Sequence, residues 1–256
     1  MSSGHDASAQ ARTGGTGADG GAGRSGPSGA GGTGVLELVE VTVRYDGAAD
    51  PALDRCSLRV GAGERVALLG ANGSGKTTIF LAAAGLVPYA GRITVAGLHL
   101  DRSRPEEVRR HLGLLFSIPE DQLLFARVLD DVAFALTSRG TDTAEAEQRA
   151  RAALDHLDAG YLAERSPYRM SRGQSVRAAL AGTFVAGPPL LLLDEPASGL
   201  DPAGRRLLIR HLNDLPSAML IATHDIDFGA RCCHRWVLLD RGRVAAGGTD
   251  FSKVEL

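Results

Sequence analysis

The chain has 256 residues, of which 44% are hydrophobic and 23% charged, a composition typical of a folded globular protein. Its formal net charge of −2 argues against binding nucleic acid by broad neutralisation of phosphates, so we predict no nucleic-acid partner. The three cysteines, Cys56, Cys232 and Cys233, are too few for a disulfide framework and favour a reducing compartment.

Apolar runs in the chain are short. None approaches the roughly 20 residues needed to cross a bilayer, and the longest, "PLLLLD" at 189–194, has the length of a buried strand. Residues 1–34 contain 12 glycines and lack the apolar core of a signal peptide. With so little apolar surface to bury, residues 1–34 are predicted to form a disordered leader. A role at a membrane would therefore require a partner.

Strand signals begin just after this leader. Residues 35–45 alternate apolar and polar side chains as a half-buried strand does, and residues 57–69 predict two strands around a glycine turn. Residues 91–100 predict another strand pair. The stretch from about 119 to 183 is mainly helical, and its clearest amphipathic helix covers 144–159.

The remaining elements complete an α/β pattern. Residues 190–193 form a continuous apolar strand, residues 218–224 predict a further strand, and residues 235–248 predict a hairpin. Strands and helices that alternate around such a buried strand predict an α/β fold with a helical insertion. We expect one domain over residues 35–250 and a short C-terminal tail over 251–256.

The stretch 70–78, "GANGSGKTT", fits the phosphate-loop pattern G-x-x-x-x-G-K-[ST] between a predicted strand and a predicted helix. Glycines let backbone N–H groups turn toward phosphate oxygens, and the helix N-terminus adds partial positive charge. Lys76 is expected to reach the β- and γ-phosphates, Thr77 to ligate Mg²⁺, and Thr78 to bind a phosphate oxygen. The predicted nucleotide-binding residues of the loop are Asn72, Gly73, Ser74, Gly75, Lys76, Thr77 and Thr78.

Two carboxylates follow the continuous apolar strand in "LLLLDEP". Asp194 and Glu195 therefore lie at the C-terminal end of a core strand, where α/β proteins build their sites. Asp194 is expected to hold Mg²⁺ through its water shell, and Glu195 to polarise the water that attacks the γ-phosphate. Adjacent side chains on an extended backbone point to different sides, so the two acids can take different roles.

Further motifs resemble those of ATP-binding-cassette (ABC) ATPases. Residues 170–174, "MSRGQ", are similar to the family signature Leu-Ser-Gly-Gly-Gln, and "SGLD" at 198–201 is similar to the D-loop. His224 stands at the switch-histidine position, and Tyr45 resembles the aromatic residue that stacks on adenine. The resemblance covers about Leu36 to Thr249. It implies a P-loop NTPase core, an antiparallel β subdomain and an α-helical subdomain that carries the signature.

The resemblance also implies a mechanism. Two cassettes would pair head to tail, each ATP lying between the phosphate loop of one chain and the signature of the other. Asp201 would link the two sites, while His224 and Glu195 would be the catalytic residues that hold the γ-phosphate and the attacking water. Catalysis would then consist mostly of positioning and charge stabilisation. The signature residues expected to act on the partner's ATP are Ser171, Arg172, Gly173 and Gln174.

Two positions depart from the family pattern. Arg172 replaces the first glycine of the signature; we expect it to point outward, and contact with the partner's γ-phosphate is the alternative. Ser117 stands where the family has the Q-loop glutamine, which bonds Mg²⁺ or the attacking water, and serine would act only through an intervening water. Gln122 keeps a separate place five residues on. We expect ATP binding and hydrolysis to persist, with weaker coupling to the membrane partner.

The stretch 120–136, "EDQLLFARVLDDVAFAL", resembles ATPases of the cobalt/nickel and energy-coupling-factor importers. It implies a peripheral ATPase subunit at the cytoplasmic face of the cell membrane. This subunit would energise import of a transition metal ion or a vitamin through a separate integral membrane permease, with a substrate-capture membrane protein. The cassettes would form a homodimer or a heterodimer with a related chain. The alternatives are the ATPase of an ABC exporter and a soluble ABC protein of translation or DNA repair.

Overall fold

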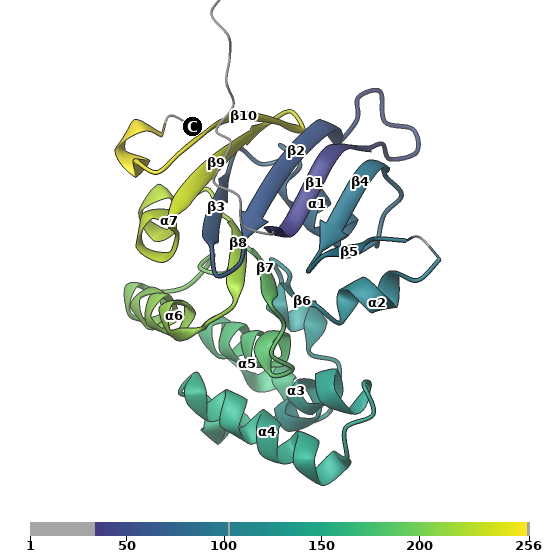
Figure 1. The fold of residues 1–256 in the computed structure, drawn as a ribbon. Coiled ribbons are helices and arrows are strands. Elements are labelled where there is room, and N and C mark those ends of the chain that lie inside the picture. Colours follow the sequence, from purple (N-terminus) through teal and green to yellow (C-terminus); the bar gives the residue numbers. More distant parts are fainter. Residues whose placement is uncertain (1–33, 102, 255–256) are drawn as a thin grey trace, which may run out of the picture. The chain divides into compact units, whose positions relative to one another are not determined.

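The computed structural model describes residues 34–101 and 103–254, which form two β-sheets with helices around them (Figure 1). The leader predicted for residues 1–34 lies outside these ranges except for Gly34, which begins β1. The strands are β1 (Gly34–Val43), β2 (Leu53–Gly61), β3 (Arg65–Leu69), β4 (Ala90–Val95), β5 (Leu98–His99), β6 (Leu112–Leu115), β7 (Leu190–Asp194), β8 (Ala218–Ala222), β9 (Arg235–Asp240) and β10 (Arg243–Gly248). The helices are α1 (Lys76–Ala83), α2 (Pro105–Arg109), α3 (Val128–Thr137), α4 (Thr143–His156), α5 (Arg172–Phe184), α6 (Pro202–Asp214) and α7 (Ile226–Cys232), with short 3₁₀ helices η1 (Pro119–Gln122), η2 (Gly160–Leu162), η3 (Pro167–Arg169) and η4 (Phe251–Lys253).

The larger sheet has six strands in the order β10-β9-β3-β8-β7-β6. Its strands are parallel except β10, which pairs with β9 in antiparallel fashion. Side chains alternate between two hydrophobic cores, so that Leu190 and Leu192 of β7 enter one core and Leu191 and Leu193 the other. Burial on both faces explains the continuous apolar run of β7. The predicted α/β class is confirmed.

The smaller sheet is antiparallel, in the order β2-β1-β4-β5. Leu36 and Leu38 of β1 share a core with Ile79 and Phe80 of α1 and with one face of the larger sheet. The predicted antiparallel β subdomain is therefore present, and α1 lies between the two sheets (Figure 1).

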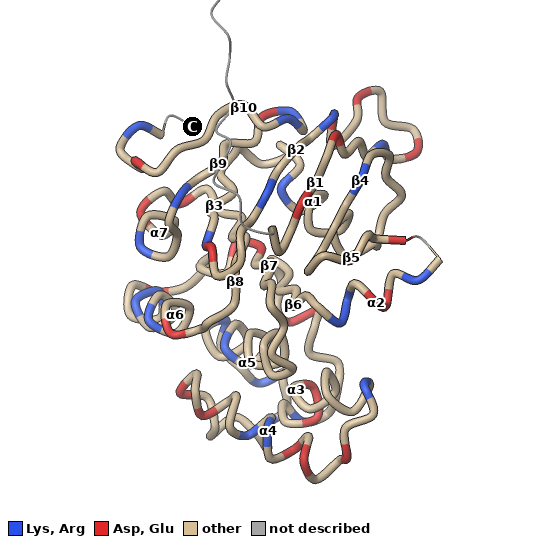
Figure 2. Tube along the Cα trace, in the orientation of Figure 1, with Lys and Arg blue, Asp and Glu red and all other residues tan. Residues whose placement is uncertain are grey.

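Helices α3, α4 and α5 pack on one another beyond one end of the larger sheet (Figure 1). Asp142 caps α4 because its carboxylate accepts hydrogen bonds from the backbone N–H of Ala144, at 2.9 Å, and of Glu145. Ala146, Ala150 and Leu154 form the buried face of α4, the stripe expected of an amphipathic helix. Acidic and basic residues both occur along α4 (Figure 2).

The carboxyl ends of β3, β6, β7 and β8 meet at one edge of the larger sheet, since these strands are parallel neighbours. The segments that follow them begin at Gly70, Phe116, Glu195 and Thr223. Open α/β sheets bind their ligands at such an edge. Within 34–101 and 103–254, no helix combines the length and the apolar character needed to cross a membrane.

A buried histidine makes the stability of this fold pH-dependent. His211 of α6 is 6% exposed, and its Nε2 lies 3.6 Å from Asp158 Oδ2 while its ring faces His156. Burial holds the pKa of His211 below its ordinary value, although Asp158 acts in the opposite direction.

We therefore expect the free energy of unfolding to fall as pH drops below about 6.5, where the unfolded chain takes up a proton that folded His211 resists. The slope due to this residue is at most the ~1.4 kcal/mol per pH unit that one proton allows. Urea titrations at a series of pH values would show a steeper fall for the natural chain than for His211→Leu. Equal slopes for the two proteins would contradict the role of His211.

Candidate nucleotide site

The phosphate loop joins β3 to α1. Gly75 has a φ of 107°, and a Cβ at this position would lie 2.6 Å from the carbonyl oxygen of Ala52, so glycine is required. Lys76 is 7% exposed, and its Nζ donates hydrogen bonds to the carbonyl oxygens of Gly70, at 2.8 Å, and Ala71, at 3.0 Å. The ammonium group therefore lies inside the curve of the loop, where phosphate oxygens would replace these carbonyls.

A hydroxyl and a carboxylate meet beside the loop. Thr77 Oγ1 donates a hydrogen bond of 2.7 Å to Asp194 Oδ2, across 117 residues of sequence. Asp194 is 2% exposed, and burial raises the pKa of its carboxyl above the ordinary value. A cation beside Asp194 would favour its charged form. Two hard oxygen donors that converge next to a phosphate loop fit Mg²⁺.

Glu195 turns the other way, toward His224. Its φ of 48° is left-handed, an uncommon conformation for a residue with a side chain, and its N–H donates to the carbonyl oxygen of Ala222 at 2.9 Å. Glu195 Oε1 lies 2.9 Å from Nδ1 of His224, and Oε2 lies 3.4 Å from the hydroxyl of Thr223. The glutamate side chain is 16% exposed but that of His224 is 65% exposed, so the imidazole faces the solvent side of the pair.

Tyr45 also lies next to the phosphate loop. Its hydroxyl is 3.4 Å from Oγ1 of Thr78, and the residue is 41% exposed. The phosphate loop, Tyr45, the two carboxylates and His224 are thus placed around the same edge of the sheet. Sequence reasoning missed Thr223, whose hydroxyl accepts from the N–H of Asp225 at 3.1 Å and approaches Glu195. The sequence feature that could have indicated Thr223 is its position next to His224 in "THD".

The signature, residues 170–174, lies at the N-terminus of α5. The Gln174 side chain accepts a hydrogen bond from the N–H of Ser171 at 2.9 Å and donates one to the Tyr161 hydroxyl at 3.2 Å. Asp201 caps α6 by accepting from the N–H of Gly204 at 2.7 Å. Within the described residues, no hydrogen bond connects signature residues 171–174 with the phosphate loop.

The expectation that Arg172 points outward is wrong. Its side chain turns back onto its own chain, where the guanidinium bonds Glu120 and the backbone carbonyl of Ser117. The physical reason is a carboxylate and free carbonyl groups within reach of a planar five-donor group. Packing within this chain does not require a glycine at position 173. A Cβ there would meet only Leu200 Cδ2, at an ordinary contact distance of 3.6 Å.

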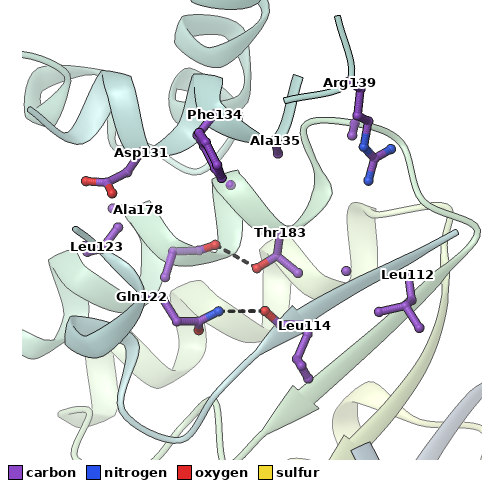
Figure 3. A pocket seen from close by; sticks show the side chains of 14 residues that line it. Leu112, Leu114, Gln122, Leu123, Asp131, Phe134, Ala135, Arg139, Ala178 and Thr183 are labelled. Atoms are coloured by element: carbon purple, nitrogen blue, oxygen red, sulfur yellow. Dashed lines mark hydrogen bonds between the residues drawn. The ribbon is translucent and has the colours of Figure 1, made fainter. Parts of the chain in front are cut away.

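Ser117 is exposed and is the second residue after the end of β6. Gln122 does not replace it toward the nucleotide, since its amide donates to the carbonyl oxygen of Leu114 and accepts from the N–H of Phe116, both at 2.8 Å. Gln122 lines a cavity of about 210 Å³ between β6, α3 and α5, together with Asp131 and other residues (Figure 3). Gln122 therefore fixes the backbone that leads to Ser117.

Comparison with known proteins identifies the family. The profile of the ABC transporter family matches residues 53–198. The chain belongs to the ABC transporter family. It is 39% identical over 220 residues to the energy-coupling factor transporter ATP-binding protein EcfA1 of Lacticaseibacillus paracasei, covering 84% of this chain and 79% of EcfA1. As an ABC ATPase, the chain binds and hydrolyses ATP.

Two solved structures are similar to this ABC ATPase. CbiO1 from Clostridium perfringens, part of the ABC transporter complex cbiONQ, has a TM-score of 0.75 and 33% identity, covering 84% of this chain and 88% of CbiO1. The dimeric bacterial ABC transporter cassette MJ0796 has a TM-score of 0.77 and 25% identity, covering 84% of this chain and 98% of MJ0796. These similarities confirm the ABC cassette fold.

Proposed function

We propose that this ABC ATPase energises import of a transition metal ion, cobalt or nickel, or of a vitamin, through a separate integral membrane permease. The similarity to EcfA1 and to CbiO1 of the cbiONQ complex supports this proposal. The ATPase would lie peripherally at the cytoplasmic face of the membrane. A substrate-capture membrane protein would complete the assembly and select the cargo.

The observation that carries the proposal is a set of exposed apolar side chains, here called the apolar surface: Ile118, Leu124 and Phe125 follow Ser117 closely in sequence, and Phe134 contacts Phe125. Their exposed fractions are 52%, 75%, 41% and 54%, and the two phenylalanine rings contact each other with centroids 5.5 Å apart. Exposed apolar side chains that gather in one region of a protein are typical of interaction surfaces. We assign this apolar surface to the permease, because it adjoins the loop at Ser117.

At the nucleotide site, each contact suggests a role. The phosphate loop with Lys76 would hold the phosphates of ATP, and Tyr45 would stack on the adenine. Thr77 and Asp194 would hold Mg²⁺, which when bound neutralises charge on the phosphate oxygens. Glu195 would polarise the attacking water and accept its proton, while His224 would orient Glu195 and contact the γ-phosphate.

Hydrolysis would require a second cassette. Because the signature does not bond the phosphate loop of its own chain, it is free to face the ATP of a partner across a head-to-tail dimer. The N-terminus of α5 would present the side chain of Ser171 and the backbone N–H of Gly173 to the γ-phosphate, while Gln174 holds the N–H of Ser171. The bare backbone of Gly173 suits such a close approach, and Asp201 would connect the two sites.

The test is affinity capture of the full chain from its native membranes, with identification of the co-purifying proteins. We expect a small integral membrane permease and a membrane protein that binds a metal ion or a vitamin. Leu124→Asp should reduce permease recovery at least about tenfold, since it places a charge inside an apolar contact. The matched control is Val244→Asp, at an exposed apolar residue of β10, which should recover the permease normally.

Capture of an export permease would replace the import proposal with that of an exporter. Recovery of ribosomes, DNA or soluble partners alone would overturn the transport role. Equal recovery with Leu124→Asp and with the natural chain would remove the apolar surface from the permease contact.

A further inference from the structure

We infer that Arg172 is a positioning residue that ties the signature to the Q-loop and the D-loop of its own chain, and so aligns them for ATP hydrolysis. This inference rests on the site roles proposed above. Its basis is that the two departures from the family pattern, Arg172 and Ser117, bond each other.

The Arg172 guanidinium contacts three segments at once. Nη2 donates a hydrogen bond of 2.5 Å to the carbonyl oxygen of Ser117, and Nη1 bonds Oε2 of Glu120 at 2.7 Å. Nε donates to the carbonyl oxygen of Ser198 at 3.3 Å. These partners lie 55, 52 and 26 residues away in sequence, so one side chain joins the first turn of α5 to the segments that follow β6 and β7.

The aliphatic part of the Arg172 side chain is packed, as its guanidinium is. A Cβ added to Gly199 would lie 3.6 Å from Cγ of Arg172, which places the aliphatic stem against the D-loop backbone. The side chain is only 27% exposed. A glycine at position 172 would make none of these contacts. A lysine would bring a single charge without the fork that reaches three acceptors.

The consequence follows from the short side chain of Ser117. A serine side chain is too short to fix the Q-loop by itself. The guanidinium of Arg172 instead donates a hydrogen bond to the backbone carbonyl of Ser117. The ion pair with Glu120 adds to this attachment of Arg172 to the Q-loop, because charge-assisted hydrogen bonds are stronger than neutral ones. Movement of the helical region relative to the sheet would thus carry the Q-loop and the signature together.

The kinetic test uses the purified full-length chain and measures kcat and KM for ATP. Arg172→Ala should lower kcat about tenfold at an unchanged KM, because alignment of reacting groups is lost while the phosphate loop is intact. Glu120→Gln should lower kcat in the same sense but less. The double variant should be no slower than Arg172→Ala alone, since Glu120→Gln weakens a contact that Arg172→Ala already removes. Arg172→Lys should recover only part of the rate.

The matched control is Arg151→Ala, which breaks an ion pair of 2.6 Å with Glu164 in the same helical region. It should leave both constants unchanged. If Arg172 instead touched the partner's γ-phosphate, Glu120→Gln would leave kcat unchanged or raise it by releasing the guanidinium. That result, or full additivity in the double variant, would overturn the inference.

A second measurement is independent of turnover. Amide hydrogen exchange of residues 116–122 should become faster in Arg172→Ala and remain unchanged in Arg151→Ala. Equal exchange in Arg172→Ala and the natural chain would contradict the inference even if hydrolysis of the isolated chain were too slow to compare. Failure of membrane capture would refute the import role but leave these kinetic and exchange results valid.

Discussion

Glu195→Gln is expected to lower the kcat of ATP hydrolysis about 100- to 10,000-fold, the range typical of losing a general base. The amide cannot accept a proton from the attacking water, yet it has the size of the carboxylate and can still bond Nδ1 of His224, now 2.9 Å from Glu195 Oε1. ATP affinity should therefore remain close to that of the natural chain. Phosphate release and an ATP-binding titration measure the two effects separately.

The matched control for this variant is Glu37→Gln on β1, an exposed glutamate on the smaller sheet. It should hydrolyse ATP at the natural rate. A Glu195→Gln protein that kept more than about a tenth of the natural kcat would remove Glu195 from the role of general base. Loss of ATP binding together with kcat would instead indicate a structural defect at the end of β7.

Lys76→Ala is expected to weaken ATP binding at least tenfold. A charge-assisted hydrogen bond contributes about 1.5–3 kcal/mol, and each ~1.4 kcal/mol corresponds to a factor of ten in affinity. Lys76 also holds the carbonyl oxygens of Gly70 and Ala71, so its removal loosens the loop as well. Calorimetric titration with ATP would measure the loss.

The chain offers a clean control for this substitution, because Lys76 and Lys253 are its two lysines. The Lys253 side chain is 78% exposed and makes an i,i+3 ion pair with Asp250, so Lys253→Ala should leave ATP affinity unchanged. Natural ATP affinity in Lys76→Ala would show that this lysine does not hold the nucleotide.

Local patterns gave correct predictions where their physical cause is local. The run at 190–193 is continuously apolar because β7 is buried on both faces between parallel neighbours. The helix predicted at 144–159 is observed as Thr143–His156, and the reversal that follows includes Asp158 with a φ of 52°. Glycine spacing in the phosphate loop likewise reflects backbone geometry, as the φ of Gly75 shows.

Arg172 shows where such reasoning fails. We expected this side chain to point outward, and nothing near it in sequence indicates otherwise. The carboxylate of Glu120 and the carbonyl of Ser117 come within reach only because the segment after β6 folds beside the N-terminus of α5. The contact of buried His211 with Asp158 has the same origin, since α6 packs against the segment that follows α4.

The amino-acid sequence was sufficient for the α/β class and the ABC family, and it located the phosphate-loop motif and the two carboxylates after β7, because each depends on backbone rules or motifs that span a few residues. Folding in three dimensions set the strand order β10-β9-β3-β8-β7-β6, which brings Thr77 to Asp194 and Glu195 to His224. It also set the direction of Arg172. These contacts join residues tens of positions apart, and side-chain direction there depends on which charged groups and carbonyls the packed chain brings within bonding distance.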